Sequence, residues 1–261
     1  MNASGAPAIE VERVTQVFPT RTGPFTALDD VSLAIGAGEF VSVIGPSGCG
    51  KSTMLLLCAG LLPATRGVIR HAGATLHAPL TDIGIVFQDH LLLDFRTALG
   101  NVLLQAHIRK LPLVAARAAA LRLFESLGIA QAADRYPRQL SGGMRQRVSI
   151  ARALLHQPTV LMMDEPFGAL DALTRTQIRH DLEMLWLEQR TTVLFITHSI
   201  EEAIALSDRV IVMSPSPGRV VDDIAIDLPR PRPAHLGDTP SFNHYAERIN
   251  AAFRQMGVIR Y

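Results

Sequence analysis

The sequence predicts an α/β fold in which helices cover a mainly parallel sheet. Short apolar runs recur along the chain, and segments with the helical spacing of apolar residues lie between them. Strands that are apolar on both faces are typical of a parallel sheet covered by helices. With 261 residues, 48% of them hydrophobic, the chain is long and apolar enough to bury a substantial core.

The strands are predicted from two kinds of pattern. Apolar and polar residues alternate over Ile9–Phe18 and Ala27–Ile35, so each of these segments favours a strand, and the Pro- and Gly-containing link PTRTGPF between them favours a loop. Continuous apolar runs predict five buried strands: Phe40–Ile44, Ile83–Gln88, Thr159–Asp164, Thr192–Thr197 and Arg209–Met213.

Helical segments are predicted between these strands. Their ranges are Ser52–Leu62, Val114–Leu127, Met144–Leu155, Ala172–Leu187 and Ile200–Leu206. The predicted apolar faces are Val114, Ala118, Leu121 and Phe124 in the second helix, and Ile178, Leu182 and Leu185 in the fourth. Because no strand-like run occurs between Leu99 and Leu155, we expect a helical subdomain inserted into the α/β core.

This organisation predicts four parts. Residues 1–95 form an N-terminal β region and the first part of the core, 96–157 the helical subdomain, and 158–214 the second part of the core. Residues 215–261 form a C-terminal extension. It begins with the Pro-rich stretches SPSPGR and LPRPRP, and it is expected to end in a helix over Phe242–Met256 that packs on the core.

Composition excludes several classes of protein. A net charge of +1 gives no reason to expect nucleic acid as a partner. The longest apolar stretch, Thr53–Leu62, is about half of what a membrane-spanning helix needs. Pro7, Glu10 and Glu12 lie where a signal peptide would be apolar, so no export is expected. Two cysteines make no disulfide framework, which fits a reducing cytosol.

The segment GPSGCGKS, Gly45–Ser52, matches the phosphate-binding pattern G-x-x-x-x-G-K-S/T. Its glycines let successive backbone N–H groups curl around a phosphate, and the following helix directs its positive end at the same place. Lys51, one of only two lysines in the chain, is a point charge able to reach the β- and γ-phosphates, and the Ser52 hydroxyl is a ligand for Mg²⁺. With a predicted strand before it and a helix after it, the segment favours a phosphate loop over a simple Gly-rich turn.

Cys49 lies inside this loop, near a helix N-terminus and Lys51. Both features favour a thiolate, so we expect Cys49 to react with a maleimide faster than Cys58.

The predicted strand VLMMDE ends in two carboxylates, Asp164 and Glu165. Alone, this pattern is equally typical of a strand that runs into a helix cap. Downstream of a phosphate loop, it predicts the Mg²⁺-associated strand of a P-loop nucleotidase, with Asp164 at the metal. Glu165 would polarise an attacking water, and an acid at this second position favours a hydrolase over a kinase.

Six segments occur in a fixed order: GPSGCGKS, Gln88 after a strand, LSGGMRQR, VLMMDEP, GALD and ITH. Alone, Ser-Gly-Gly before a helix would favour a simple N-cap. Together, the six segments resemble the ATP-binding subunits of ABC transporters, over essentially residues 9–214. The resemblance implies a P-loop nucleotidase core with an N-terminal antiparallel β region and an inserted helical subdomain. It implies ATP and Mg²⁺ as cofactors.

The resemblance also implies a role for each matching residue. Catalysis would fall to Glu165, His198, Gln88 and Lys51, and the metal to Ser52, Gln88 and Asp164. His198 would contact the γ-phosphate, Asp171 would communicate between two sites, and the signature residues would bind ATP held by a second subunit. The residues implied in nucleotide binding are Phe18, Gly45, Pro46, Ser47, Gly48, Cys49, Gly50, Lys51, Ser52, Thr53, Gln88, Ser141, Gly142, Gly143, Asp171 and His198.

Two positions qualify the match. An aromatic residue near the first strand usually stacks on adenine in this family; Phe18 is our choice because it ends that strand, and Phe25 is the alternative. The signature commonly has Gln where this chain has Met144, and a methionine side chain cannot form the hydrogen bonds of an amide. The backbone N–H donors of Ser141–Gly143 do not depend on that side chain.

The forms LSGGMRQRV, VFPTRTGPFTALDDVSL and MSPSPGRVVDDIAIDLPRPRP resemble the importer branch for nitrate, sulfonates and taurine. This implies a homodimer of ATPase subunits, two membrane-spanning permease subunits and an extracytoplasmic solute-binding protein, with this chain peripheral on the cytoplasmic face of the inner membrane. The branch often has a Pro-Trp pair where LDF follows Gln88, so the solute itself stays open.

A second hypothesis is a soluble ABC-type ATPase that acts in DNA repair or translation without a membrane partner. Such proteins usually carry coiled-coil arms or two fused cassettes. This chain has one cassette and no heptad run, so the sequence favours the importer.

Overall fold

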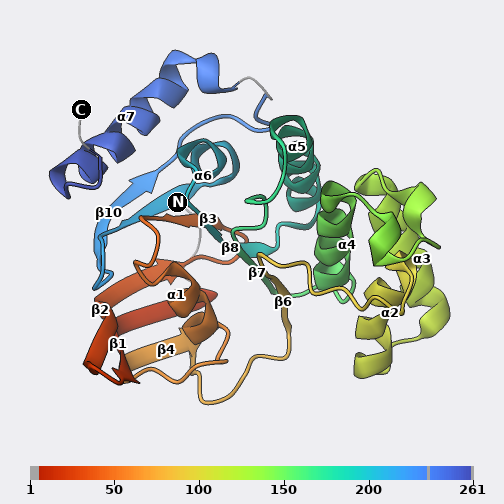
Figure 1. Cartoon of the computed structure of the whole chain (residues 1–261), viewed down its shortest axis with the longest axis horizontal. Coiled ribbons are helices and arrows are strands. Elements are labelled where there is room, and N and C mark those ends of the chain that lie inside the picture. Colours follow the sequence, from red (N-terminus) through yellow and green to blue (C-terminus); the bar gives the residue numbers. More distant parts are fainter. Residues whose placement is uncertain (1–5, 234–235, 260–261) are drawn as a thin grey trace. The chain divides into compact units, whose positions relative to one another are not determined.

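A computed structural model describes residues 6–233 and 236–259 (Figure 1). The chain divides into two compact units. Unit 1 contains the residues up to Thr81 together with those from Thr192 onward, and unit 2 contains Asp82–Thr191. Unit 2 therefore includes strands and a long helix in addition to the predicted helical subdomain, and the four-part division of the sequence stays a prediction.

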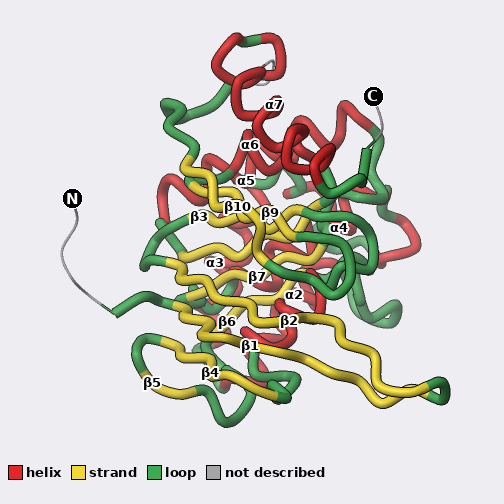
Figure 2. The backbone as a smooth tube through the Cα atoms, turned by 90° about the vertical axis from the view of Figure 1, so that its left-hand side faces the viewer, coloured by secondary structure: helices red, strands yellow, loops and turns green. Residues whose placement is uncertain are grey.

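Unit 1 begins with an antiparallel sheet in the order β2-β1-β4-β5. Figure 2 shows β1 and β2 as a long two-stranded ribbon. The sheet buries Ile9, Val11 and Val14 of β1 against the core, which the alternation of the sequence predicts. The bounds of the four strands are Ile9–Thr20 for β1, Gly23–Ile35 for β2, Arg66–His71 for β4 and Ala74–Thr75 for β5.

The other strands of unit 1 follow the order β10-β9-β3-β8. β3 is parallel to both β8 and β9, whereas β10 is antiparallel to β9. Every residue of β3 and of β8 is buried, as expected for strands that are covered on both faces. The bounds are Phe40–Ile44 for β3, Thr192–Thr197 for β8, Arg209–Met213 for β9 and Val220–Ala225 for β10.

The described part of unit 1 contains three α-helices, α1 (Lys51–Cys58), α6 (Ile200–Leu206) and α7 (Pro240–Gln255), with a 3₁₀ turn at Leu236–Asp238. The C-terminal helix α7 confirms the predicted one. Its Phe242, Ile249 and Phe253 are buried in one cluster with residues of α6 and β9.

Unit 2 contains two parallel strands and four helices. β6 and β7 pair from Ile83 opposite Val160 to Val86 opposite Met163. In Figure 1 the helices α2 to α5 run through the yellow-green to blue-green part of the chain. The bounds are Ile83–Val86 for β6, Ala98–Arg109 for α2, Leu113–Ser126 for α3, Gly142–Leu154 for α4, Val160–Asp164 for β7 and Ala172–Gln189 for α5, with 3₁₀ turns at Ala130–Ala132 and Pro137–Gln139.

The predicted fold class is confirmed: the structure has parallel strands covered by helices, an antiparallel N-terminal sheet and a helical region. No helix within residues 6–233 and 236–259 is long and apolar enough to cross a membrane.

The predicted loop PTRTGPF is wrong for most of its length. The β1–β2 ladder continues through Phe18 opposite Phe25 to Thr20 opposite Gly23, so that only Arg21 and Thr22 form the turn. Cross-strand pairing along a ribbon overrides the usual preference of Pro and Gly for loops.

The acidic strand β10 was not predicted, because Asp222 and Asp223 interrupt its apolar pattern. In the structure, Asp222 forms an ion pair with Arg248 and Asp223 forms one with Arg209. These partners belong to other elements, 26 and 14 residues away in the sequence, so the local pattern of β10 does not predict them.

The predicted apolar face of the second helix is wrong in part. Phe124 is buried as predicted, but Val114 is 88% exposed and Ala118 is also exposed, and the other buried residues of α3 are Ala116, Ala120 and Leu123. Small alanine side chains allow neighbouring helices to approach closely, and they carry too little apolar surface to mark the buried face in the sequence.

Candidate nucleotide-binding site

The phosphate loop lies in unit 1, between the end of β3 at Ile44 and the start of α1 at Lys51. Gly48 and Gly50 have φ values of 77° and 97°, a conformation that favours glycine. Gly50 is the N-cap of α1, and no side chain caps this helix. The first N–H groups of α1 therefore remain available to an anion.

Lys51 is nearly buried, with 5% of its surface exposed. Its Nζ donates to the carbonyl oxygen of Gly45 at 2.9 Å and to that of Pro46 at 3.1 Å. The ammonium group is thus held over the loop by the loop's own backbone. Ser47, Gly48 and Ser52 are exposed at the same segment.

His198 follows β8 and is exposed. Its chain neighbours are fixed by a local network: Ser199 N donates to Thr197 Oγ1 at 3.0 Å, and the Ser199 hydroxyl caps α6 by accepting from Glu202 N at 3.2 Å. The hydroxyl of Thr197 in turn donates to the buried carboxylate of Glu202, at 2.5 Å. The backbone that carries His198 is thereby held from both sides.

The two candidate adenine-stacking residues are neighbours. Phe18 of β1 lies directly opposite Phe25 of β2 in the antiparallel ladder. Side chains at such a pair point to the same face of the sheet, with their Cβ atoms roughly 5 Å apart. Phe25 is 46% exposed and Phe18 is partly buried. The structure therefore places both candidates on one face of the β1–β2 ribbon.

The acidic strand end lies in unit 2. β7 ends at Asp164, and the next residue, Glu165, has a φ of 43°. A positive φ is uncommon for a residue other than Gly, and such backbone persists where the surrounding structure enforces it. Both side chains are half-buried. The strand end thus presents Glu165 through an unusual backbone conformation.

The signature segment begins helix α4. Ser141 is its N-cap, with Oγ accepting from Met144 N at 3.2 Å, and the exposed hydroxyl retains its own proton to donate. A Cβ on Gly143 would lie 2.4 Å from the Thr174 Cγ2 of α5, so only glycine fits there.

Asp171 caps α5 by accepting from Thr174 N at 3.0 Å, and this hydrogen bond lowers the pKa of the Asp171 carboxyl below its ordinary value. Thr174 therefore contacts the signature through Gly143 and the predicted communication residue Asp171 through its backbone.

Gln88, two residues beyond β6, is exposed. The residues that anchor its loop were missed by sequence reasoning: His90 Nδ1 lies 2.7 Å from Gln146 Oε1, and the Arg152 guanidinium donates to the carbonyl oxygens of His90 and Leu91 at 2.9 and 2.6 Å. Gln146 and Arg152 both belong to α4. The only signal was the place of Gln146 inside LSGGMRQR, and that segment points to the signature, not to the loop of Gln88.

The predicted Mg²⁺ ligands offer the oxygen donors that this cation prefers: Ser52 in unit 1, and Gln88 and Asp164 in unit 2. Ser52 and Gln88 are exposed, so their donors fit a metal that binds together with nucleotide phosphates. Among the described residues, no group of three or more His, Cys, Asp and Glu side chains is arranged to hold a metal.

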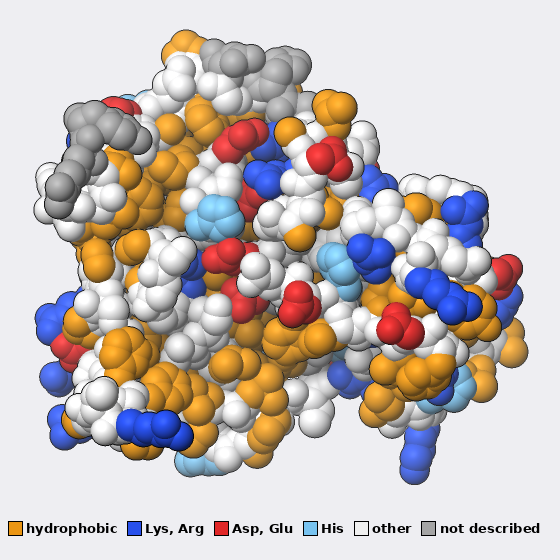
Figure 3. Space-filling model, viewed as in Figure 1, with side chains coloured by type: hydrophobic (Ala, Val, Ile, Leu, Met, Phe, Trp, Pro, Cys, Tyr) orange, Lys and Arg blue, Asp and Glu red, His pale blue; other side chains and the backbone are white. Residues whose placement is uncertain are grey.

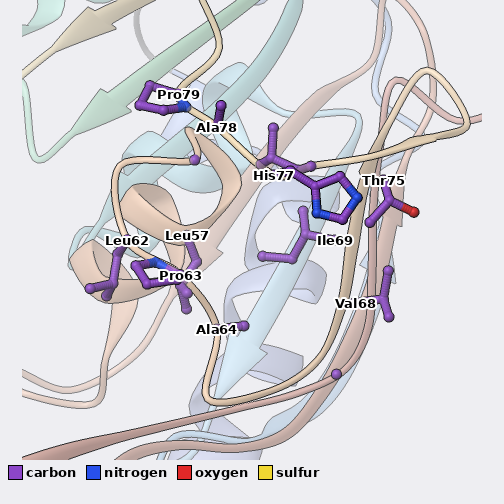
Figure 4. Close-up of a pocket in the computed structure, with 13 residues that line it drawn as sticks. Leu57, Leu62, Pro63, Ala64, Val68, Ile69, Thr75, His77, Ala78 and Pro79 are labelled. Atoms are coloured by element: carbon purple, nitrogen blue, oxygen red, sulfur yellow. The ribbon is translucent and has the colours of Figure 1, made fainter.

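A separate pocket of about 510 Å³ lies in unit 1 (Figure 4). It is lined mainly by apolar side chains, with His77 and Thr75 at one side, and it contains none of the predicted site residues. Of the predicted site residues, Phe18, the phosphate loop and His198 belong to unit 1, whereas Gln88, the signature, Asp164, Glu165 and Asp171 belong to unit 2.

Known proteins are similar to this chain in sequence and in fold. Residues 28–168 match the family model described as ABC transporter. The taurine import ATP-binding protein of Rhizobium johnstonii is 44% identical, over 97% of this chain and 98% of its own. The nitrate import ATP-binding protein of Synechococcus elongatus is 40% identical (93% and 90%), and the bicarbonate transport ATP-binding protein of Synechocystis sp. is 43% identical (86% and 80%).

Two solved structures of the ATP-binding cassette MJ0796 are also similar, each with a TM-score of 0.75 and covering 84% of this chain and 99% of that chain. One is a dimer at 34% identity, and the other, at 33%, is a post-hydrolysis state bound to ADP and Pi. The predicted resemblance is confirmed, and the chain belongs to the ABC transporter family.

Proposed function

We propose that the chain is the subunit that binds and hydrolyses ATP to energise an importer for a small, anionic solute of the nitrate, sulfonate or taurine kind. The observation that carries this proposal is the similarity to import ATP-binding proteins over nearly the whole chain, together with the six motifs of this sequence.

The predicted site residues of both units have roles in this proposal. In unit 1, Phe18 stacks on adenine, residues 45–53 hold the phosphates through backbone N–H groups and Lys51, and His198 contacts the γ-phosphate. In unit 2, Glu165 accepts a proton from the attacking water, and Gln88 orients that water. Ser52, Gln88 and Asp164 would hold Mg²⁺, and the cation would supply positive charge against the phosphates.

The proposed active form is a head-to-tail homodimer. Ser141, Gly142 and Gly143 of one subunit donate to the γ-phosphate of ATP held by the other subunit, and Asp171 communicates between the two sites. Support comes from the dimeric structure of MJ0796. It also comes from Ser141, whose exposed hydroxyl caps α4 as an acceptor and keeps its own proton to donate.

Two permease subunits are the proposed membrane partners. Several large apolar side chains of unit 2 are exposed, which is typical of a protein-binding surface: Phe95 is 74% exposed, Ile108 66% and Leu91 59%. Figure 3 shows hydrophobic side chains interspersed with Lys and Arg over the part of unit 2 that carries α2 and α3. The chain would then be peripheral, on the cytoplasmic face of the inner membrane, and an extracytoplasmic binding protein would select the solute.

The experiment is to purify the tagged full-length chain from its native cells in mild detergent. We expect a membrane-bound complex with a polytopic partner, an ATPase activity, and stimulation of that activity by the solute-binding protein loaded with its solute. A Glu165→Gln chain should form the same complex without turnover. An active ATPase that stays in the soluble fraction without a membrane partner would contradict the proposal and favour the soluble ABC-type ATPase.

A further inference from the structure

A tight turn between β9 and β10 is closed by its own hydrogen bonds. Ser214 N donates to the Arg219 carbonyl oxygen at 2.9 Å, and Arg219 N donates to Ser214 Oγ at 3.0 Å. The Ser214 hydroxyl lies 3.0 Å from the Pro215 carbonyl oxygen and 3.1 Å from that of Pro217, so its one proton is donated within the turn. Residues Ser214–Arg219, the 214–219 turn, thus form a small fixed unit of the C-terminal part of the chain.

The 214–219 turn is bonded to strand β2. Gly218 N donates to the Ala27 carbonyl oxygen at 2.9 Å, and Asp29 N donates to the Gly218 carbonyl oxygen at 3.0 Å. The guanidinium of Arg219 forms an ion pair with the Asp29 carboxylate. Gly218 is therefore held between two backbone hydrogen bonds and has little freedom to move.

The α-carbon of Gly218 faces the phosphate loop. A Cβ on Gly218 would lie only 2.0 Å from the carbonyl oxygen of Cys49, far closer than any side-chain carbon can approach. Two further glycines of the phosphate loop pack closely against neighbouring strands. A Cβ on Gly50 would lie 2.6 Å from Leu28 Cδ2 of β2, and one on Gly45 would lie 3.1 Å from Met213 Cβ at the end of β9. The phosphate loop therefore packs against β2, the end of β9 and the 214–219 turn.

We propose that Gly218 is a positioning residue of the nucleotide site, and that the 214–219 turn sets the orientation of a phosphate-binding N–H group. This inference rests on the proposed function. The Cys49 carbonyl and the Gly50 N–H belong to one planar peptide unit, so a displacement of that carbonyl rotates the N–H. Gly50 is the N-cap of α1, where backbone N–H groups face the site of the phosphates.

The consequence is specific. A side chain at Gly218 must push the Cys49 carbonyl away, because the turn cannot retreat from β2 without losing two hydrogen bonds and an ion pair. The Gly50 N–H then no longer points at the phosphate. Affinity for nucleotide falls, whereas Glu165, in the other unit, is untouched.

The test compares Gly218→Ala with Gly237→Ala in the full-length chain. Gly237 is the matched control, because no atom of the described residues lies within 4 Å of a Cβ added there. We expect Gly218→Ala to raise the Kd for MgATP at least about tenfold and to raise KM far more than it lowers kcat, as loss of a charge-assisted hydrogen bond predicts. The control should bind as the wild type does.

A second variant keeps the inference testable if Gly218→Ala does not fold. Ser214→Ala opens the turn without adding an atom near the loop, and we expect it to raise the Kd about fivefold, with little change in the melting temperature of the nucleotide-free protein. Wild-type affinity in both variants, or an equal loss in Gly237→Ala, would overturn the inference. If wild-type protein itself does not bind MgATP, the proposed function fails, and this inference fails with it.

Discussion

His90 Nδ1 lies 2.7 Å from Gln146 Oε1, and this hydrogen bond joins the loop of Gln88 to the helix that begins at the signature. Arg152 of the same helix holds the carbonyl oxygens of His90 and Leu91. Two segments that the sequence separates by more than forty residues, and that our proposal gives different roles, are thus anchored to one helix. A movement of α4 is expected to carry the Gln88 loop with it.

This arrangement predicts a stability that falls in mild acid. Burial lowers the pKa of His90, and also that of His156, below the ordinary value of 6.5. As the pH falls through 6.5, the unfolded chain takes up protons before the folded chain does, so the folded state loses stability as the pH falls below about 7.5. Urea unfolding of the full-length chain at several pH values measures this.

The matched variants are His90→Gln and His180→Gln. The first removes one titrating group and should flatten part of the pH dependence, whereas the second changes an exposed histidine of α5 and should leave the dependence as it is. The same slope in wild type and His90→Gln would contradict the assignment to His90.

The cross-strand pair of Phe18 and Phe25 predicts that both residues contribute to adenine binding. Loss of one stacking ring is expected to weaken ATP binding about tenfold. Because the two rings lie on one face, the double variant Phe18→Ala/Phe25→Ala should lose less than the sum of the single losses. Phe95→Ala, at an exposed phenylalanine of unit 2, is the control. An unchanged affinity in Phe25→Ala would leave Phe18 as the sole stacking residue.

Glu165→Gln should keep ATP binding and stop turnover. The amide preserves the shape of the side chain but cannot accept the proton of the attacking water, so hydrolysis should fall by roughly 10²–10⁴-fold. Nucleotide binding and phosphate release, measured on the same preparation, separate the two effects. Hydrolysis at a near wild-type rate would show that Glu165 is not the general base.

Mixed dimers test the composite site. A Lys51→Ala homodimer loses one half of each site, and so does a Ser141→Arg homodimer. A mixed dimer of these two chains has one site with both defects and one intact site, because Lys51 and Ser141 of one chain serve different ATP molecules in the proposed arrangement. With Glu165→Gln added to every chain, we expect the mixed dimer to retain about one ATP, as nucleotide trapping measures. Equal retention in all three dimers would exclude the head-to-tail arrangement.

The cysteines give a prediction in which the structure changes the expectation. Cys49 and Cys58 are each only 1% exposed, so the rapid alkylation of Cys49 expected from its place in the loop is not supported by its accessibility. Burial also raises the pKa of the Cys58 thiol to about 12, which keeps it protonated. We expect a maleimide to label Cys49 slowly, and more slowly with MgATP, and to label Cys58 only on unfolding. Mass mapping with and without urea checks this, and native labelling at Cys58 first would contradict it.

The sequence by itself determined the elements whose cause is local. The apolar runs of β3, β8 and β9 have the predicted bounds, because strands covered on both faces need continuous apolar sequence. The predicted apolar stripe Ile178, Leu182 and Leu185 is buried, since a helix with three large side chains on one face has one way to pack. The phosphate loop and the signature are short contiguous segments, so their residues can be recognised as motifs in the sequence.

Only the tertiary structure decided the relationships between separate elements. The pairing of Phe18 with Phe25 depends on the register of the β1–β2 ribbon, and the carboxylates of β10 are paired with arginines of other elements. The contact of Gly218 with the phosphate loop joins residues separated by most of the sequence. Such contacts depend on how the elements pack together, and the local sequence of one element does not identify which residues of another element it will contact.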